Sequence, residues 1–200
     1  LARTTARKSL VLLRNDGTLP LAASVGAVAV IGPSADDARN LFGDYAYPAH
    51  VESLRVLLDS GGDPFAREKD DAAAAPGFDV GAPTVLDALR ARLGARVQYA
   101  RGCEIEGSAR DGFAEALALA READVAVLVV GDKSGLTDDC TSGETRDRAS
   151  LDLPGVQQEL VRAVLETGTP VVLVLVAGRP YGTAAVHEGC AAVLLSWLPG

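Results

Sequence analysis

Runs of small and β-branched apolar residues recur along this sequence, and glycine, proline or charged residues bound each run. The segment GAVAVIGP at 26–33 is the first example. Its nearly continuous apolar residues are typical of a strand buried on both faces of a sheet, and Gly32-Pro33 ends it. Four later segments share the pattern. We therefore predict five strands, at 26–33, 96–102, 124–132, 170–178 and 191–197.

Segments with a helical period separate the predicted strands. They lie at 84–93, 111–123, 155–166 and 181–187, and a further, partly helical segment lies at 51–58. Strands that alternate with amphipathic helices usually pair in parallel and carry helices on both faces of the sheet. The predicted fold class is therefore α/β: a three-layer αβα sandwich around a mainly parallel open sheet, in a flavodoxin-like arrangement.

The start of the chain and two irregular stretches complete this pattern. Apolar residues at 10–13 suit a helix over 4–14, which the turn residues at 15–17 would close. The segment 61–83 is rich in glycine, proline and charge, and we expect an exposed excursion there. The segment 132–154 follows a buried strand. Because ligands bind at the carboxyl ends of parallel strands, we expect it to be an active-site loop.

Length and charge limit the possible partners. A chain of 200 residues with 48% hydrophobic content can bury a core, so we expect one α/β domain over 1–200, and a fragment of a longer protein. The formal charge of −8 disfavours nucleic acid and anionic membrane surfaces as partners. The apolar runs are much shorter than the roughly 20 residues of a membrane-spanning helix, so we expect no membrane segment.

The sequence gives no support for cofactor or metal chemistry. Three cysteines lie far apart, with neither a CxxC pair nor a histidine at ligand spacing: Cys103, Cys140 and Cys190. The Gly32-Pro33 turn lacks the later glycines of a dinucleotide-binding loop. We therefore expect no cofactor and no metal. Reduced thiols favour a cytoplasmic location, and secretion stays open if a signal lies upstream.

The carboxylates of the 132–154 loop are the best candidates for chemistry. Glu144 is the only glutamate among several aspartates, and it follows Ser142-Gly143. Glycine lets the main chain turn sharply there, which would push the glutamate side chain outward. Taken alone, a solvated loop carboxylate is the simpler interpretation of Glu144.

Longer motifs change that interpretation. The run SGETRDRASLDLPGVQQEL at 142–160 resembles the segment of glycoside hydrolase family 3 in which a Gly-Glu lies shortly before a Leu-x-Leu-Pro and a Gln-rich helix. Further segments that are similar to this family are ARKSLVLLRNDGTLPL, AVAVIGPSADD, LFGDYAYPAH, VLVLVAGRPY and LLSWLPG. The resemblance covers nearly the whole chain.

The resemblance implies the C-terminal α/β sandwich domain of a retaining, exo-acting β-glycosidase, with β-linked glucosides as the first expected substrates and β-xylosides as the second. It places an aspartate nucleophile and most of the sugar pocket on an N-terminal (β/α)8 barrel that this chain lacks. Glu144 matches the family's general acid/base, and we expect the fragment alone to be inactive. Thr145 stands where many members have glycine, which leaves loop shape and aglycone preference open.

Three further residues are candidates for substrate binding. Asp147 and Arg148 either lie near the sugar, pair with each other or cap the loop. Tyr47 shares the GDYAYPAH loop with Tyr45 and His50, and it is a candidate to stack on a pyranose ring. The alternative function is a non-catalytic α/β module whose loop acids only bind a small sugar or effector. Hydrolysis needs a protonatable carboxyl that faces a partner domain, whereas binding tolerates an amide in its place.

Overall fold

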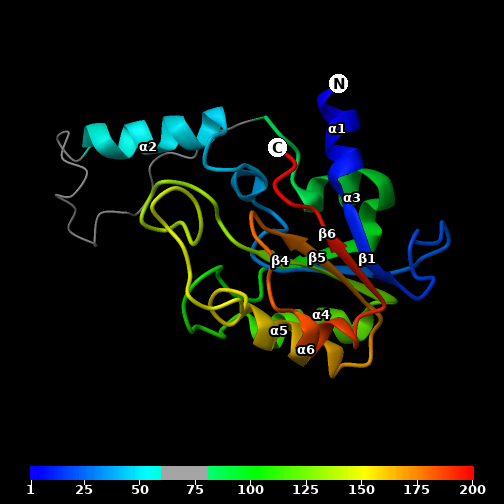
Figure 1. Ribbon diagram of the computed structural model, residues 1–200. Helices are drawn as coiled ribbons and strands as arrows, with labels where there is room; N and C mark the ends of the chain where they lie inside the picture. Colours follow the sequence, from blue (N-terminus) through cyan, green and yellow to red (C-terminus); the bar gives the residue numbers. More distant parts are fainter. Residues whose placement is uncertain (60–80) are drawn as a thin grey trace.

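A six-stranded sheet organises the residues described in the computed structural model, which are 1–59 and 81–200 (Figure 1). The strand order is β1-β6-β5-β4-β2-β3. Five strands run parallel to one another: β2 (Val28–Ile31), β3 (Val97–Ala100), β4 (Val125–Gly131), β5 (Val171–Val176) and β6 (Ala192–Leu195). They confirm the five predicted strands and the mainly parallel α/β fold.

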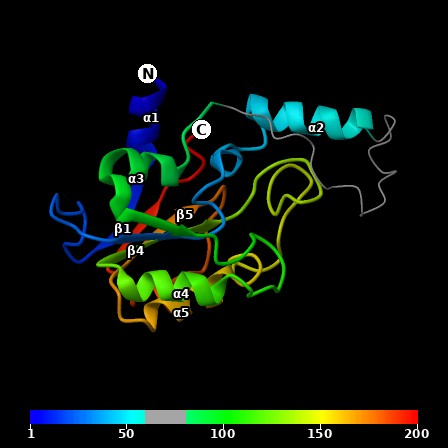
Figure 2. The same ribbon diagram turned by 180° about the vertical axis from the view of Figure 1, so that it is seen from behind.

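Helices cover both faces of the sheet (Figures 1 and 2). One face carries α4 (Phe113–Glu122), α5 (Gln157–Leu165) and α6 (Ala184–His187), and the other carries α3 (Val85–Leu93). The other helical segments are α1 (Ala2–Ser9), α2 (Tyr47–Asp59) and two 3-10 turns, Ala38–Leu41 and Gly94–Arg96. The predicted helices lie within a few residues of α2 to α6. None of the helices in the described ranges is long and apolar enough to cross a membrane.

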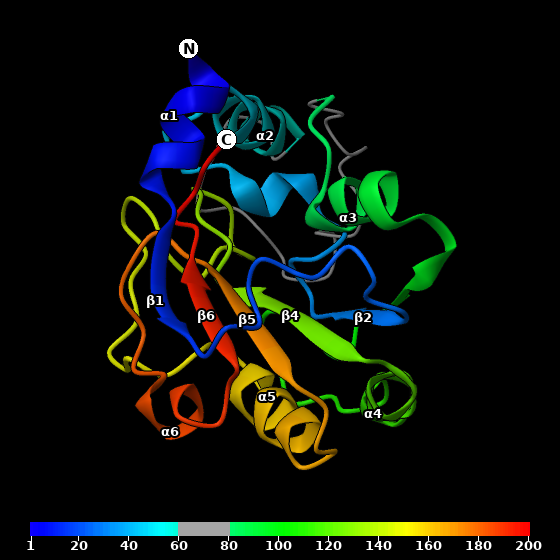
Figure 3. The same cartoon turned by 90° about the vertical axis from the view of Figure 1, so that its right-hand side faces the viewer.

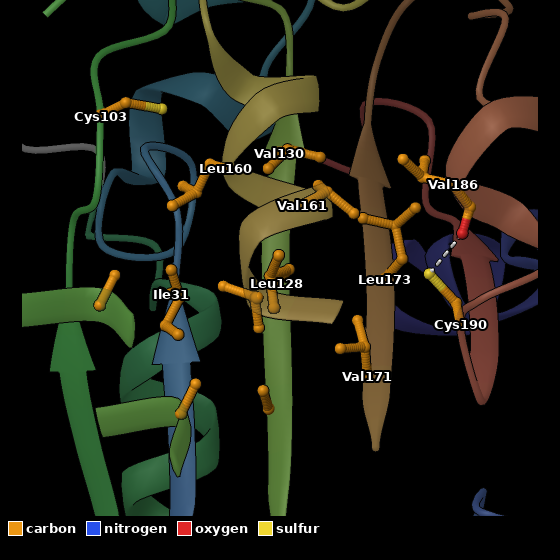
Figure 4. Packing of buried hydrophobic residues seen from close by; sticks show 14 of the residues in the cluster. Ile31, Cys103, Leu128, Val130, Leu160, Val161, Val171, Leu173, Val186 and Cys190 are labelled. Atoms are coloured by element: carbon orange, nitrogen blue, oxygen red, sulfur yellow. Dashed lines mark hydrogen bonds between the residues drawn. The ribbon is translucent and has the colours of Figure 1, made fainter. Parts of the chain in front are cut away.

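Two apolar clusters, one on each face, explain the continuous apolar runs of the sequence. Leu128 of β4 and Leu173 of β5 are fully buried with Leu160 of α5 on one face (Figure 4). On the opposite face, Val127 of β4 belongs to a cluster with Leu86 of α3. Since neighbouring residues of a strand point to opposite faces, a strand covered on both sides must be apolar at every position.

The predicted helix over 4–14 is wrong in its second half. α1 ends at Ser9, and Val11–Asn15 form β1, which pairs antiparallel with β6 (Figure 3). The Arg14 Nε–H also donates to the Cys190 carbonyl at 2.8 Å. Four successive apolar residues fit a strand as well as a helix, and backbone pairing with β6 decides the outcome. The predicted excursion at 61–83 lies outside the described residues, except for 81–83.

The direction in which the sheet grows reverses between β2 and β4. The chain adds β3 on one side of β2, and then β4, β5 and β6 on the other. In open α/β sheets, ligands bind beyond the carboxyl ends of the strands at such a reversal, because the connections there diverge. The connections that leave this point are 32–46 after β2 and the 132–154 loop after β4.

The side chain of Gln157, the first residue of α5, holds both ends of the 132–154 loop. Its Oε1 accepts a hydrogen bond from the Gly131 N–H at 2.8 Å. Its Nε2 donates to the carbonyls of Gly131 at 2.8 Å, Ile105 at 2.9 Å and Pro154 at 3.2 Å. Gln157 is fully buried, so these four hydrogen bonds form away from bulk water and satisfy buried main-chain groups.

We expect Gln157→Ala to lower the free energy of unfolding by about 2 to 4 kcal/mol, because it leaves buried polar groups of Gly131 without partners. Urea unfolding followed by circular dichroism would measure this. The matched control is Gln158→Ala, since Gln158 is partly exposed on the same helix. Equal, small effects of the two substitutions would contradict a structural role for the Gln157 amide.

Candidate functional site

The 132–154 loop leaves the carboxyl end of β4 and lies against the connection that follows β2. Two hydrogen bonds to Ser134 join the segments. The Asp44 N–H donates to Ser134 Oγ at 3.2 Å, and Arg39 Nη2 donates to the Ser134 carbonyl at 2.9 Å. The loop is therefore fixed near its start to residues far away in sequence.

The loop folds back on itself before it reaches Glu144. The Thr141 N–H donates to the Lys133 carbonyl at 2.9 Å, and the Gly135 N–H donates to the Ser142 carbonyl at 3.0 Å. Gly143 has φ of 131°, and a Cβ atom there would lie 2.5 Å from the Gly135 carbonyl oxygen. Only glycine fits both the backbone conformation and the space at this position.

Glu144 follows this glycine, and its side chain is exposed. Its main-chain N–H donates to Asp44 Oδ2 at 2.9 Å, and its Oε2 accepts a hydrogen bond from the Tyr45 hydroxyl at 3.1 Å. Thr145, the next residue, has φ of 63°, which is uncommon for a β-branched residue. The turn at Glu144 is therefore held from outside by the connection that follows β2.

A half-buried charged cluster supports the base of the loop. Glu52 of α2 accepts hydrogen bonds from Arg39 Nε at 2.9 Å and from Lys133 Nζ at 3.2 Å. Lys133 also pairs with Asp139. Burial lowers the pKa of Lys133, but the hydrogen bond and charge of Asp139 and the charge of Glu52 outweigh it and raise that pKa overall. The cluster thus joins α2, the 3-10 turn at Ala38–Leu41 and the 132–154 loop.

A buried carboxyl joins the loop to the connection that follows β5. Asp132 is fully buried directly after β4. Its Oδ1 accepts from the Gly178 N–H at 3.2 Å, and its Oδ2 accepts from the Tyr181 hydroxyl at 3.0 Å. Burial raises the pKa of Asp132, although these hydrogen bonds oppose the shift. The carboxyl ends of β4 and β5 are therefore linked by hydrogen bonds of the Asp132 side chain as well as by the main-chain pairing of the two strands.

The structure places the three predicted binding residues around the loop. Asp147 is exposed and pairs with Arg179, which also donates to the Arg148 carbonyl at 3.0 Å. The Arg148 guanidinium pairs with Glu106 at 2.6 Å, so the side chains of Asp147 and Arg148 have different ionic partners. Tyr47 is 74% exposed at the start of α2. The sequence predicts Tyr47 as the aromatic contact of this region, and the structure shows that Tyr45 contacts Glu144.

Two polar hollows flank the loop. One has a volume of about 600 Å³, and its lining includes Arg101, Glu106, Lys133 and Arg148. The other has a volume of about 420 Å³ and lies against the carboxyl end of β5, with Gly178 in its lining. Within residues 1–59 and 81–200, no three side chains of histidine, cysteine, aspartate or glutamate are grouped so that they could hold a metal ion.

The contact between Tyr45 and Glu144 can be measured by titration. The hydrogen bond to the Glu144 carboxylate and the charge of that carboxylate raise the pKa of the Tyr45 phenol above its ordinary value of 10.0. We expect Glu144→Gln to lower this pKa towards the ordinary value, because the charge is lost. Carbon NMR of ring-labelled tyrosine would follow the titration, with Tyr45→Phe assigning the signal.

The matched control is Glu166→Gln, since Glu166 is exposed at the far end of α5. It should leave the Tyr45 titration unchanged, and circular dichroism should show that the fold persists at the highest pH used. If Glu144→Gln had no more effect than this control, the carboxylate would not contact Tyr45 in solution.

Known proteins resemble the chain over its whole length. It is 36% identical over 98% of its length to a beta-xylosidase of Formosa agariphila, and 32% identical over 100% to a periplasmic beta-glucosidase of Salmonella typhimurium. It spans only 24% and 25% of these two relatives. In structure, a beta-glucosidase of Listeria innocua in complex with isofagomine matches 100% of the chain, with 26% identity and a TM-score of 0.71; the chain covers 23% of that structure.

The sequence profile of one protein family matches almost the entire chain. This profile is the glycosyl hydrolase family 3 C-terminal domain, and the match extends over residues 10–200. It includes β1 to β6, the 132–154 loop and the connection that follows β2. The chain therefore belongs to glycoside hydrolase family 3, as a C-terminal domain of that family.

Proposed function

We propose that this domain supplies Glu144 as the general acid/base of a retaining β-glycosidase whose nucleophile lies on another part of a longer polypeptide. The observation that carries the proposal is the position of Glu144. Its carboxylate is exposed at the carboxyl edge of the sheet, beside the point where the strand order reverses. The turn that carries it is held by Asp44 and by the packing of Gly143 against Gly135. Open α/β sheets bind ligands at this place.

The partners of the neighbouring carboxylates favour Glu144 as the acid. Asp138 pairs with Arg146, Asp139 with Lys133, and Asp147 with Arg179. Burial raises the pKa of Asp139, but the hydrogen bond from Lys133 and the charge of Lys133 outweigh burial and lower that pKa overall. Glu144 instead accepts from the neutral Tyr45 hydroxyl. Glu144 thus differs from these three aspartates in its partner, a neutral hydroxyl, and its carboxylate is exposed, so we assign the acid to Glu144.

Retaining hydrolysis requires a second carboxyl group about 5 to 5.5 Å from the first, which attacks the anomeric carbon. The chain matches a C-terminal domain of its family, so a domain that precedes it can supply this second carboxyl group. We therefore propose that the nucleophile belongs to an N-terminal (β/α)8 barrel in the same polypeptide. The length of the relatives supports this, since the chain spans about a quarter of them.

An exposed apolar edge also supports a covering domain. Leu10, Val11, Leu12 and Leu13 are successive residues with exposed fractions between 38% and 53%. Contiguous exposed apolar side chains commonly mark a surface that another part of a protein covers. We propose that the rest of the polypeptide packs against β1 and thereby reaches the sheet edge that carries Glu144.

The proposed substrates are β-linked glucosides or xylosides, cleaved from a chain end. The names of the relatives support this class, because they include beta-glucosidases and beta-xylosidases. Glucose and xylose differ by one hydroxymethyl group. We propose that the barrel recognises this group. Asp147, Arg148 and Tyr47 are proposed to contribute contacts at the edge of the shared site.

We expect Glu144→Ala in the complete polypeptide to slow cleavage of aryl glycosides with poor leaving groups by about 10² to 10⁴-fold in kcat/KM, because these need protonation as the bond breaks. An aryl glycoside of a very acidic phenol should form the glycosyl-enzyme almost normally. Its hydrolysis should then stall without a general base, and azide should restore turnover and give the β-glycosyl azide. Steady-state kinetics and product analysis would measure both.

Two controls complete this experiment. Glu166→Ala should leave both substrates unaffected, and the isolated 200-residue chain should release no phenol, because the proposed nucleophile is absent from it. Equal losses on good and poor leaving groups, with no azide rescue, would indicate a binding role for Glu144. Turnover by the isolated chain above the level of its own Glu144→Ala variant would contradict a site shared between two domains.

A further inference from the structure

We propose that Asp44 and Tyr45 are positioning residues for Glu144: Asp44 fixes its main chain, and Tyr45 determines which carboxyl oxygen carries the transferable proton. This inference rests on the proposed function, because it assigns Glu144 the role of acid/base. It concerns residues of the connection that follows β2, which lie 99 and 100 positions away from Glu144 in sequence.

Asp44 connects the two segments in both directions. Its side chain accepts the Glu144 N–H at 2.9 Å, and its own N–H donates to Ser134 Oγ at 3.2 Å. Asp44 thus binds the 132–154 loop at two points, at Ser134 near its start and at Glu144 in its middle. Thr145 has positive φ, a conformation that costs energy for a β-branched residue and persists where surrounding contacts hold it.

Tyr45 contacts one of the two carboxyl oxygens. Its hydroxyl lies 3.1 Å from Glu144 Oε2. In a protonated carboxyl group, the carbonyl oxygen accepts hydrogen bonds better than the hydroxyl oxygen. A donor at Oε2 therefore favours the carbonyl form there and places the proton on Oε1. Tyr45 is 70% exposed, and the His50 ring lies beside it, with centroids 6.2 Å apart and planes tilted by 55°.

The proposed proton path balances over the two half-reactions. In the first, the proton on Oε1 moves to the glycosidic oxygen as its bond to the anomeric carbon breaks, which leaves Glu144 ionised. In the second, water gives a proton back to Oε1 as its oxygen attacks the anomeric carbon and releases the nucleophile. Tyr45 keeps its proton throughout. The raised pKa of its phenol agrees with a permanent donor to the carboxylate.

The test compares two tyrosines in the complete polypeptide. We expect Tyr45→Phe to lower kcat/KM by about 10-fold for aryl glycosides with poor leaving groups, as part of the larger effect of general acid catalysis, and to leave acidic phenols nearly unaffected. Tyr99→Phe is the matched control, since Tyr99 lies on β3 at the far edge of the sheet. In a Glu144→Ala background, Tyr45→Phe should cause no further loss.

Asp44 has a conservative variant that separates position from charge. Asp44→Ala should reduce activity on poor leaving groups in the same way, whereas Asp44→Asn keeps an acceptor for the Glu144 N–H and should restore most of it. If Glu144→Ala shows the dependence on leaving group but Tyr45→Phe behaves like Tyr99→Phe, the positioning role is wrong and the acid is correct. A Tyr45→Phe loss that persists in the Glu144→Ala background would also overturn the inference.

Discussion

The side-chain amide of Gln157 is the contact on which the geometry of this domain depends most. It bonds the N–H and the carbonyl of Gly131, where β4 ends, and the carbonyl of Pro154, where the 132–154 loop ends. The loop is therefore closed at its base inside the protein, by a group with no exposure. An amide suits this place because it both donates and accepts, whereas a carboxylate would face three carbonyl oxygens.

Beyond the Gln157 contacts, ion pairs and hydrogen bonds determine the path of the 132–154 loop. Glu52 holds Arg39 and Lys133 together, and Asp132 binds the connection that follows β5. Lys133 and Asp132 at the start of the loop are thus paired, and the turn at Glu144 is the part that reaches outward. Such a division is what a site shared between two domains requires: a rigid support with one carboxyl group presented at its surface.

Much of the fold could be predicted from the sequence, because strands covered on both faces must be apolar at every position, as in β4 and β5. The β1 strand could not, since Leu10 to Leu13 fit two periodicities and only pairing with β6 decides between them. The 132–154 loop could be predicted from its place after a buried strand, and the choice of Glu144 within it rests on the family motif. Their contacts with Asp44 and Tyr45 could not be predicted, because they arise where the connections after β2 and β4 meet. No local pattern records a contact between residues 100 positions apart.

The central claim is that Glu144 completes an active site with a carboxyl group from another domain. A crystal structure of the complete polypeptide, with a mechanism-based inhibitor bound covalently to the nucleophile, would test it most directly. The account predicts that the Glu144 carboxyl lies about 5 to 5.5 Å from the labelled carboxyl group, on the side of the leaving oxygen. A different carboxyl group in that position, with Glu144 pointing away from the trapped sugar, would contradict it.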